Sequence, residues 1–179
     1  PLLAPLEIER DEGALAPSQL EAAEIIREHL ERGTSSDRTP VIQLVGPDAL
    51  SKQLVAGHAA TALGLHPYRL PADLLPKETS ALEMLARLWQ RESILLPVAL
   101  YLDAFELDED APTGGQSPPL HRFLARSDGF FFLDTRDVRS RLGRSSLTLD
   151  ISKPTPAEQR DAWSAVLGKD AGDSPAALG

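Results

Sequence analysis

The chain alternates between short apolar runs and longer stretches in which apolar residues recur at helical spacing. Nearly uninterrupted apolar runs at residues 41–45, 98–102 and 129–134 predict strands that are covered on both faces. Two further strands are expected at about 67–70 and 146–151, and helices at 18–32, 49–63, 77–92, 120–125 and from 156 onward. This order predicts a three-layer α/β domain with a mainly parallel, five-stranded sheet.

We expect one folded domain at residues 38–168, preceded by an N-terminal helix and linker at 1–37. Residues 1–17 carry three prolines and no sustained period, which predicts a surface segment. Residues 169–179 are small and polar and predict a flexible tail. Because the chain starts at Pro1 and ends in this tail, we expect a fragment of a longer polypeptide that continues into a further C-terminal part.

The helix at 77–92 has the clearest division into two faces. We expect its buried face to carry Leu82, Leu85, Leu88 and Trp89, with the charged residues turned outward. That pattern predicts a helix that covers one side of the sheet.

Charge and composition narrow the class of protein. Eighteen basic and 27 acidic residues give a formal net charge of -9, so the chain would repel a nucleic-acid backbone. The absence of cysteine excludes disulfides and thiolate metal sites. No run approaches the roughly 20 apolar residues of a membrane span. We expect a cytoplasmic, soluble protein that binds neither nucleic acid nor membrane.

The most informative stretch follows the first central strand. Gly46 and Lys52 stand at the first glycine and the lysine of the phosphate-binding motif G-x-x-x-x-G-K-[ST]. In such a loop, backbone N–H groups and the lysine bind phosphates, and the final hydroxyl ligates Mg²⁺. The candidate ATP-binding residues are Gly46, Pro47, Asp48, Ala49, Leu50, Ser51, Lys52 and Gln53.

Two positions of this loop depart from the motif. Ser51 replaces the second glycine and brings a Cβ to a place where a ligand approaches closely. Gln53 replaces the Ser/Thr and offers an amide oxygen in place of the hydroxyl. Lys52 keeps the residue type that binds phosphate, although a solvated lysine in the first turn of a helix would give the same pattern.

A second candidate site follows the strand at 98–102. The strand followed by Asp103 resembles a Walker B segment, in which the aspartate holds a metal ion, and an aspartate that caps a turn is the alternative interpretation. The next residue is Ala104, so the carboxylate that would polarise an attacking water is missing, a loss of roughly 10²- to 10⁴-fold in general-base assistance. Glu106 comes two residues too late to replace it without rearrangement.

A polar residue and several arginines follow the strand at 129–134. Thr135 is a candidate sensor of the γ-phosphate, or part of an ordinary turn. One of the nearby arginines could act as an arginine finger toward a neighbouring subunit, or all could solvate an exposed loop; they are Arg136, Arg139, Arg141 and Arg144. Right-handed crossovers place this segment at the same sheet edge as the two sites above.

Together these segments resemble AAA+ ATPases, and more narrowly a bacterial type in which a winged-helix segment precedes a degenerate AAA+ domain and then an intact one. The resemblance spans residues 38–168 and includes the strand and helix at 147–163, similar to the family's last core strand and lid helix. It implies a P-loop NTPase fold, ATP and Mg²⁺, and catalytic roles for Asp103 and Thr135, with Asp103 as metal ligand. It also implies an oligomer that contacts another AAA+ domain or subunit and a protein substrate.

Two functions follow from this resemblance. In the first, Ser51, Gln53 and Ala104 mark a degenerate domain that has a structural or regulatory role in an ATP-dependent protein-remodelling machine, with weak or absent nucleotide binding. The alternative is a working AAA+ ATPase whose motifs are completed by Glu106 or by another subunit. A non-nucleotide α/β scaffold is less favoured, since the chain has no G-x-S-x-G elbow.

Overall fold

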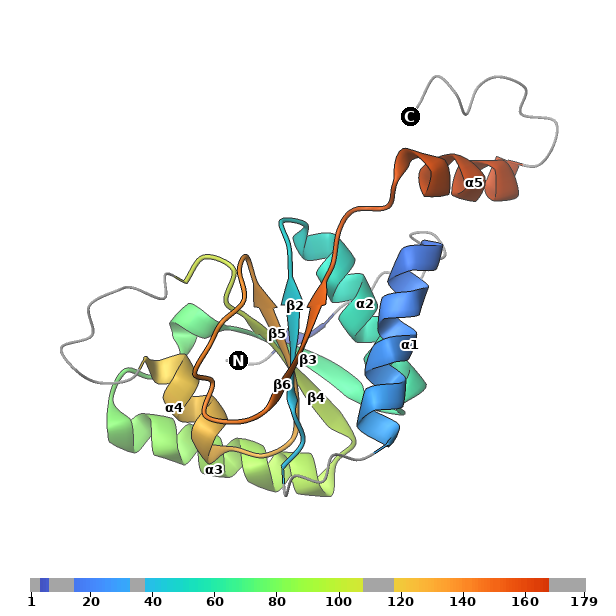
Figure 1. Ribbon diagram of the computed structural model, residues 1–179. Helices are drawn as coiled ribbons and strands as arrows, with labels where there is room; N and C mark the ends of the chain where they lie inside the picture. The colour runs from blue at the N-terminus through green and yellow to red at the C-terminus, as the bar shows by residue number, and fades with distance from the viewer. Residues whose placement is uncertain (1–3, 7–14, 33–37, 108–117, 168–179) are drawn as a thin grey trace.

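The chain folds around a six-stranded sheet with helices on both faces (Figure 1). The computed structural model describes residues 4–6, 15–32, 38–107 and 118–167, with side chains up to residue 161. The strands are β1 (Ala4–Pro5), β2 (Val41–Val45), β3 (His66–Pro71), β4 (Val98–Asp103), β5 (Phe130–Thr135) and β6 (Ser146–Asp150). The helices are α1 (Pro17–Glu31), α2 (Ala49–Ala62), η1 (Ala72–Leu74, a 3-10 turn), α3 (Thr79–Leu95), α4 (Pro119–Arg126) and α5 (Pro156–Leu167). The predicted tail at 169–179 lies outside the described residues.

The α/β class and the mainly parallel sheet are confirmed, but the predicted number of five strands is wrong. The strand order is β1-β3-β4-β5-β2-β6, and every pair is parallel except β1 with β3. The sixth strand is β1, in the segment expected on the surface. It has only two residues, so no period could reveal it, and its proline is tolerated because β1 lies at the edge of the sheet.

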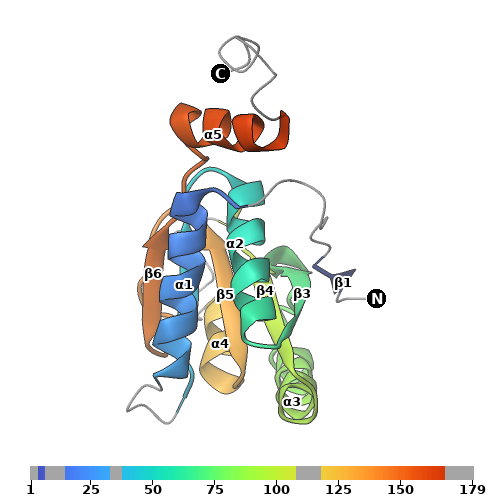
Figure 2. The ribbon, with the colours of Figure 1, turned by 90° about the vertical axis from the view of Figure 1, so that its right-hand side faces the viewer.

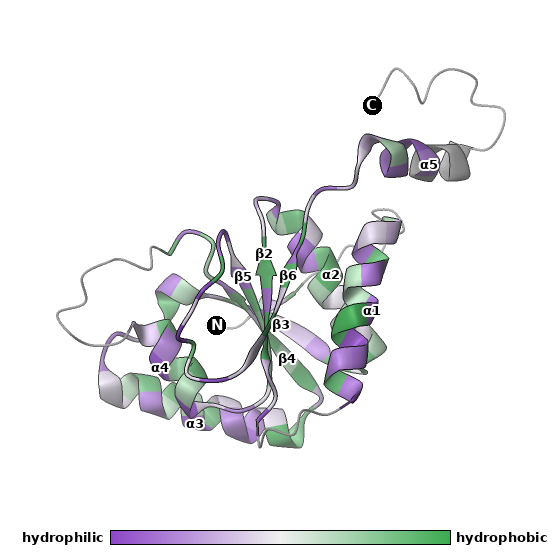
Figure 3. Cartoon of the chain, in the orientation of Figure 1, coloured by the Kyte–Doolittle hydropathy of each residue, from purple (hydrophilic) through white to green (hydrophobic). Residues whose placement is uncertain are grey.

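The two faces of the sheet bury separate apolar layers. On β4, Leu100 and Leu102 point toward α3 and α4, whereas Ala99 and Tyr101 point toward α1 and α2. The same alternation continues on β5, as expected where successive side chains of a strand point to opposite faces. Figure 2 shows α1 and α2 together in front of the sheet, and in Figure 3 the central strands carry the hydrophobic colour.

The sheet contains a topological switch point beside β2. The connection after β2 runs through α2, which packs on the face shared with α1, whereas Leu142 in the connection after β5 belongs to the apolar layer of α3 and α4. The two connections therefore diverge to opposite faces at the carboxyl ends of neighbouring strands. In open α/β sheets, this is the position at which ligands bind.

The helix α3 differs from its predicted pattern at one position. Leu82 and Trp89 are buried, as predicted, and Leu85 is partly buried, but Leu88 is 47% exposed. The buried residues of α3 are Leu82, Ala86 and Trp89, so its buried face is narrower than the sequence suggests.

The helix α5 begins with a capping box formed by Thr155 and Glu158, and it contacts the start of α1. The Glu158 carboxylate accepts hydrogen bonds from the Thr155 N–H and from the Ser18 N–H, at 2.8 and 2.9 Å. Among the helices of the described residues, none is both long and apolar enough to cross a bilayer.

Candidate functional site

The turn between β2 and α2 has only three residues. Gly46, Pro47 and Asp48 connect the two elements, and the helical backbone already begins at Ala49. The backbone N–H groups that were expected to line an open phosphate-binding loop therefore lie in the first turn of a helix. Leu50 is 55% exposed there, and Gln53 is half-buried.

Asp48 caps this helix with its own carboxylate. Oδ2 accepts a hydrogen bond from the Ser51 N–H at 3.0 Å, and Oδ1 lies 3.7 Å from Lys153 Nζ. Burial acts to raise the pKa of Asp48, but the hydrogen bonds with Ser51 and the charge of Lys153 outweigh it and lower the pKa overall. A negative charge of the protein thus already occupies the end of the helix that attracts phosphate.

Gly46 is required by packing at this point. Its φ of +136° lies in a region that favours glycine, and an added Cβ would lie 2.3 Å from the Ile151 carbonyl oxygen. The Gly46 N–H donates to the Thr135 carbonyl at 3.3 Å. The glycine of the motif is thus explained by the close approach of the segment that follows β6.

Lys52 is fully buried, and its ammonium group is fully used by the protein. Nζ donates to the Gly46 carbonyl at 2.6 Å and to the Thr135 carbonyl at 3.2 Å, and it forms an ion pair with Asp134. An ammonium group has three donors. These three acceptors match them one for one, so no proton of Lys52 is left for a phosphate.

Asp134 connects this lysine to the core of the sheet. Its Oδ2 accepts a hydrogen bond from the Tyr101 hydroxyl at 2.7 Å, while its other oxygen pairs with Lys52. Burial raises the pKa of Asp134 above its usual value, and the hydrogen bonds from Lys52 and Tyr101 offset only part of that rise. The result is a buried Lys52–Asp134–Tyr101 network that spans β4, β5 and α2.

Phe105 covers the lysine from the side of β4. Lys52 Nζ lies 4.5 Å from the centre of the Phe105 ring, and the Arg136 guanidinium carbon lies 4.7 Å from it. Both cations are attracted by the ring, which adds to the stability of the arrangement. Where an ATPase would have a catalytic carboxylate after Asp103, this chain has a buried Ala104 and then this aromatic ring.

Asp103 is not part of the network. Its carboxylate pairs with the Arg69 guanidinium on β3, at a place where Arg69 is 43% exposed. Within the described ranges, no group of three or more His, Cys, Asp or Glu side chains could hold a metal ion. As arranged, these residues do not fit Mg²⁺-bound ATP, because the lysine has no free donor and the predicted metal ligand is paired with an arginine.

Thr135 contributes its backbone more than its side chain. Its carbonyl accepts from both Lys52 and Gly46, whereas its buried hydroxyl has no hydrogen-bond partner in the part of the chain that the structure describes. The structure therefore brings Thr135 to Lys52, as a sensor position would require. It is the carbonyl, though, that faces the ammonium group.

Two of the four candidate arginines hold loops in place. Arg139 donates to the Ala104 and Leu107 carbonyls, and its backbone N–H and C=O both bond to the Gln43 amide. Arg144 donates to the Ser127 carbonyl at 2.9 Å. Arg141 is exposed, with a positive φ of 66°. The single polar residue within β2 thus anchors the loop that follows β5.

The sequence did not reveal three members of this site. Asp134 was visible as a carboxylate at the end of an apolar run, and pairing its strand with β2 would have brought it to Lys52. Tyr101 and Phe105 gave no such signal, since each looks like an ordinary core residue.

Ser51 is buried and accepts a hydrogen bond from the Gln19 side chain on α1 at 2.8 Å.

Comparison with known proteins identifies no family for this chain. No protein-family model matches it, and none of the curated proteins is significantly similar to it.

Replacing Lys52 with Met should destabilise the fold by about 3 to 5 kcal/mol, because Asp134 is left as an uncompensated buried charge. Chemical denaturation would measure this loss. The matched control is Lys153→Met, which removes a lysine that is 73% exposed and should change the free energy of unfolding by less than about 1 kcal/mol. Equal effects of the two variants would contradict a structural Lys52.

The cost of Lys52→Met should also depend on pH. Without the lysine, the folded-state pKa of Asp134 rises further above its unfolded value, so stability is retained below the unfolded pKa and is lost as pH rises through the folded pKa. The gap from the wild type should therefore narrow in acid. Lys52→Met/Asp134→Asn should abolish this pH dependence, and denaturation curves at several pH values would detect it.

Gly46→Ala should be far more destabilising than Gly64→Ala. Both glycines have a positive φ, but nothing lies within 4 Å of the Cβ added at Gly64, while the one added at Gly46 collides with a backbone carbonyl. The left-handed strain alone costs roughly 1 to 2 kcal/mol, which is the effect expected at Gly64. Similar unfolding midpoints for the two variants would show that the approach of Ile151 is not limiting.

Proposed function

We propose that this chain is a degenerate P-loop domain of the AAA+ type, with a structural or regulatory role in a larger ATP-dependent assembly. In this proposal, it binds nucleotide weakly or not at all and contributes a rigid body to its neighbours. The other members of such an assembly would be an active AAA+ domain or subunit and a protein substrate.

The observation that carries the proposal is the internal pairing of Lys52. All three donors of its ammonium group have protein acceptors, and the side chain is fully buried. A phosphate could compete for this lysine only if the ion pair with Asp134 broke, which would leave a buried carboxylate without its partner. The lysine that would bind phosphate in an ATPase thus acts as an internal counter-ion.

The type of domain is supported by the position of the site. The lysine-bearing turn follows β2, at the switch point between β2 and β5, and Asp103 ends the strand on the far side of β5. This is where a nucleotide would lie in an α/β domain of this kind. Ser51, Gln53 and Ala104 stand where such a site would have a phosphate-binding glycine, a hydroxyl ligand of Mg²⁺ and a carboxylate that polarises water. Together these departures favour loss of catalysis.

Nucleotide binding can be tested by thermal unfolding with Mg²⁺-bound ATP at millimolar concentration. A ligand at about 100 times its Kd adds about 2.7 kcal/mol to the free energy of unfolding, so a working site would raise the unfolding midpoint clearly. We expect no shift for the wild type. A fluorescent ATP analogue, titrated in parallel, should show no saturable binding.

The alternative, a working AAA+ ATPase with motifs completed in an assembly, gives a different result. It requires saturable ATP binding and steady phosphate release that Lys52→Ala abolishes. Asp103→Ala would separate the two further, because it should weaken Mg²⁺-dependent binding in an ATPase and leave nucleotide response unchanged here. Turnover lost with Lys52 would overturn the proposal.

A further inference from the structure

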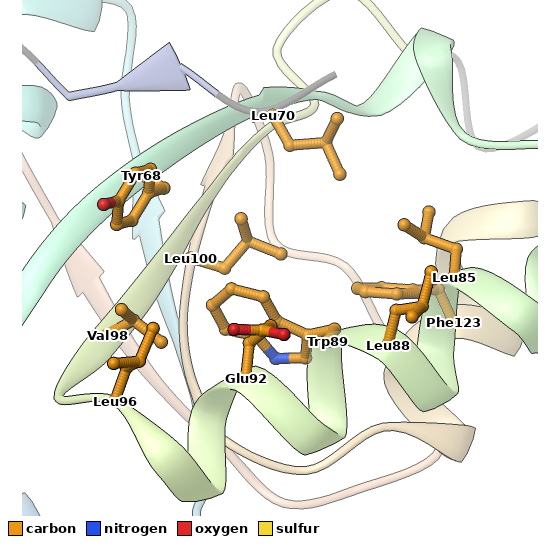
Figure 4. A pocket seen from close by; sticks show the side chains of 10 residues that line it. All are labelled: Tyr68, Leu70, Leu85, Leu88, Trp89, Glu92, Leu96, Val98, Leu100 and Phe123. Atoms are coloured by element: carbon orange, nitrogen blue, oxygen red, sulfur yellow. The ribbon is translucent and has the colours of Figure 1, made fainter. Parts of the chain in front are cut away.

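An apolar pocket opens between α3 and the β3–β4 part of the sheet, away from the Lys52 site (Figure 4). Its volume is about 430 Å³. Leu70, Leu100 and Phe123 form a buried floor, and Leu88 and Leu96 form a half-exposed rim. The remaining lining residues are Tyr68, Leu85, Trp89, Glu92 and Val98, of which only Glu92 is charged.

The apolar surface continues beyond the pocket along α3. Ten large apolar side chains are exposed in the described parts of the chain, and five of them lie between residues 84 and 96. Met84, Leu88 and Leu95 are 63%, 47% and 67% exposed, and with Arg91 they are spaced four, three and four residues apart. This spacing places them in one stripe on one side of the helix. Figure 3 shows the hydrophobic colour at the C-terminal end of α3.

Scattered apolar side chains on a surface need no explanation, but a continuous stripe beside an apolar pocket indicates an interface. The stripe is longer than the pocket, so a small molecule in the pocket would leave Met84 and Leu95 exposed. A β-strand could not extend the sheet here, because β1 already pairs with the outer edge of β3 at Tyr68 and Arg69. The pocket and the stripe together therefore fit a helix that carries leucine side chains and a basic residue that pairs with Glu92.

The helix α3 itself has this chemistry. Arg91 interrupts its apolar stripe, and Arg91 donates to Glu92 Oε1 at 2.7 Å, so opposite charges lie side by side at the middle of the stripe. When two such helices pack antiparallel about residues 91 and 92, Leu88 of one copy meets Leu95 of the other. The same arrangement sets Arg91 against Glu92 of the second copy, so the surface is complementary to itself, as a two-fold interface requires.

We propose that two copies of this chain associate through this face, with α3 of each copy packed antiparallel along α3 and over the pocket rim of the other. The interface buries exposed leucines of α3, among them Leu88 and Leu95, and keeps one arginine in reach of a carboxylate on each side, a composition typical of interface cores. This inference does not depend on whether the Lys52 site binds a nucleotide.

Analytical ultracentrifugation of the 179-residue chain, at micromolar to submillimolar concentrations, would measure its oligomeric state and test this proposal. We expect the mass to rise with concentration from the 19.4 kDa of one chain toward twice that value. Leu88→Asp/Leu95→Asp should weaken self-association at least about tenfold, since charges would be buried in an apolar interface. The matched control is Leu20→Asp, a leucine on α1 that is 41% exposed, and it should leave self-association unchanged.

A charge exchange gives a second readout that does not depend on the leucines. Arg91→Glu should weaken self-association by placing two acids at the centre of the interface, and Arg91→Glu/Glu92→Arg should restore it. Thermal unfolding would show that the variants fold. A chain that stays monomeric at every concentration overturns the proposal, as does a dimer that Leu88→Asp/Leu95→Asp leaves intact.

Discussion

The buried ion pair between Lys52 and Asp134 is the constraint on which the loop edge of this domain depends. A charged pair is tolerated at full burial only when every remaining donor and acceptor is satisfied. Here the Gly46 and Thr135 carbonyls and the Tyr101 hydroxyl complete the set. The pair thereby fixes the turn after β2 to the end of β5, two segments that are far apart in the sequence.

Other contacts at the same edge of the sheet also hold its loops in place. The Gln43 side chain holds the backbone of Arg139, and Arg139 reaches the carbonyls beyond β4. Ile151 lies so close to Gly46 that no other residue fits there. The edge at which open α/β sheets bind ligands is therefore joined by the protein's own side chains. This is the physical basis for the proposal that the domain has a structural or regulatory role.

The opposite end of the sheet differs in character. The Lys52 ammonium group is fully paired within the chain, whereas the α3 face leaves leucines and a methionine exposed beside a cavity. Apolar surface that stays exposed in the folded chain can still be buried in a complex, and its burial then stabilises the association. The two regions therefore divide the domain into a closed edge and a face with unburied apolar area.

The amino-acid sequence alone was enough to predict the layered α/β class, the positions of the main strands and helices, and the segments that meet at one sheet edge. A strand that is buried on both faces must be apolar throughout, and a helix that is buried on one face must carry apolar residues at helical spacing. Both patterns can therefore be read from the local sequence. The two-residue β1 and the exposure of Leu88 were decided by tertiary structure, since a strand so short has no period and a helix face is buried only where a neighbour covers it. The role of Lys52 was decided in the same way. The spacing of Lys52 from Gly46 permitted a phosphate ligand or a solvated lysine. Only the pairing of β2 with β5 brought Asp134 close enough to make Lys52 a buried counter-ion.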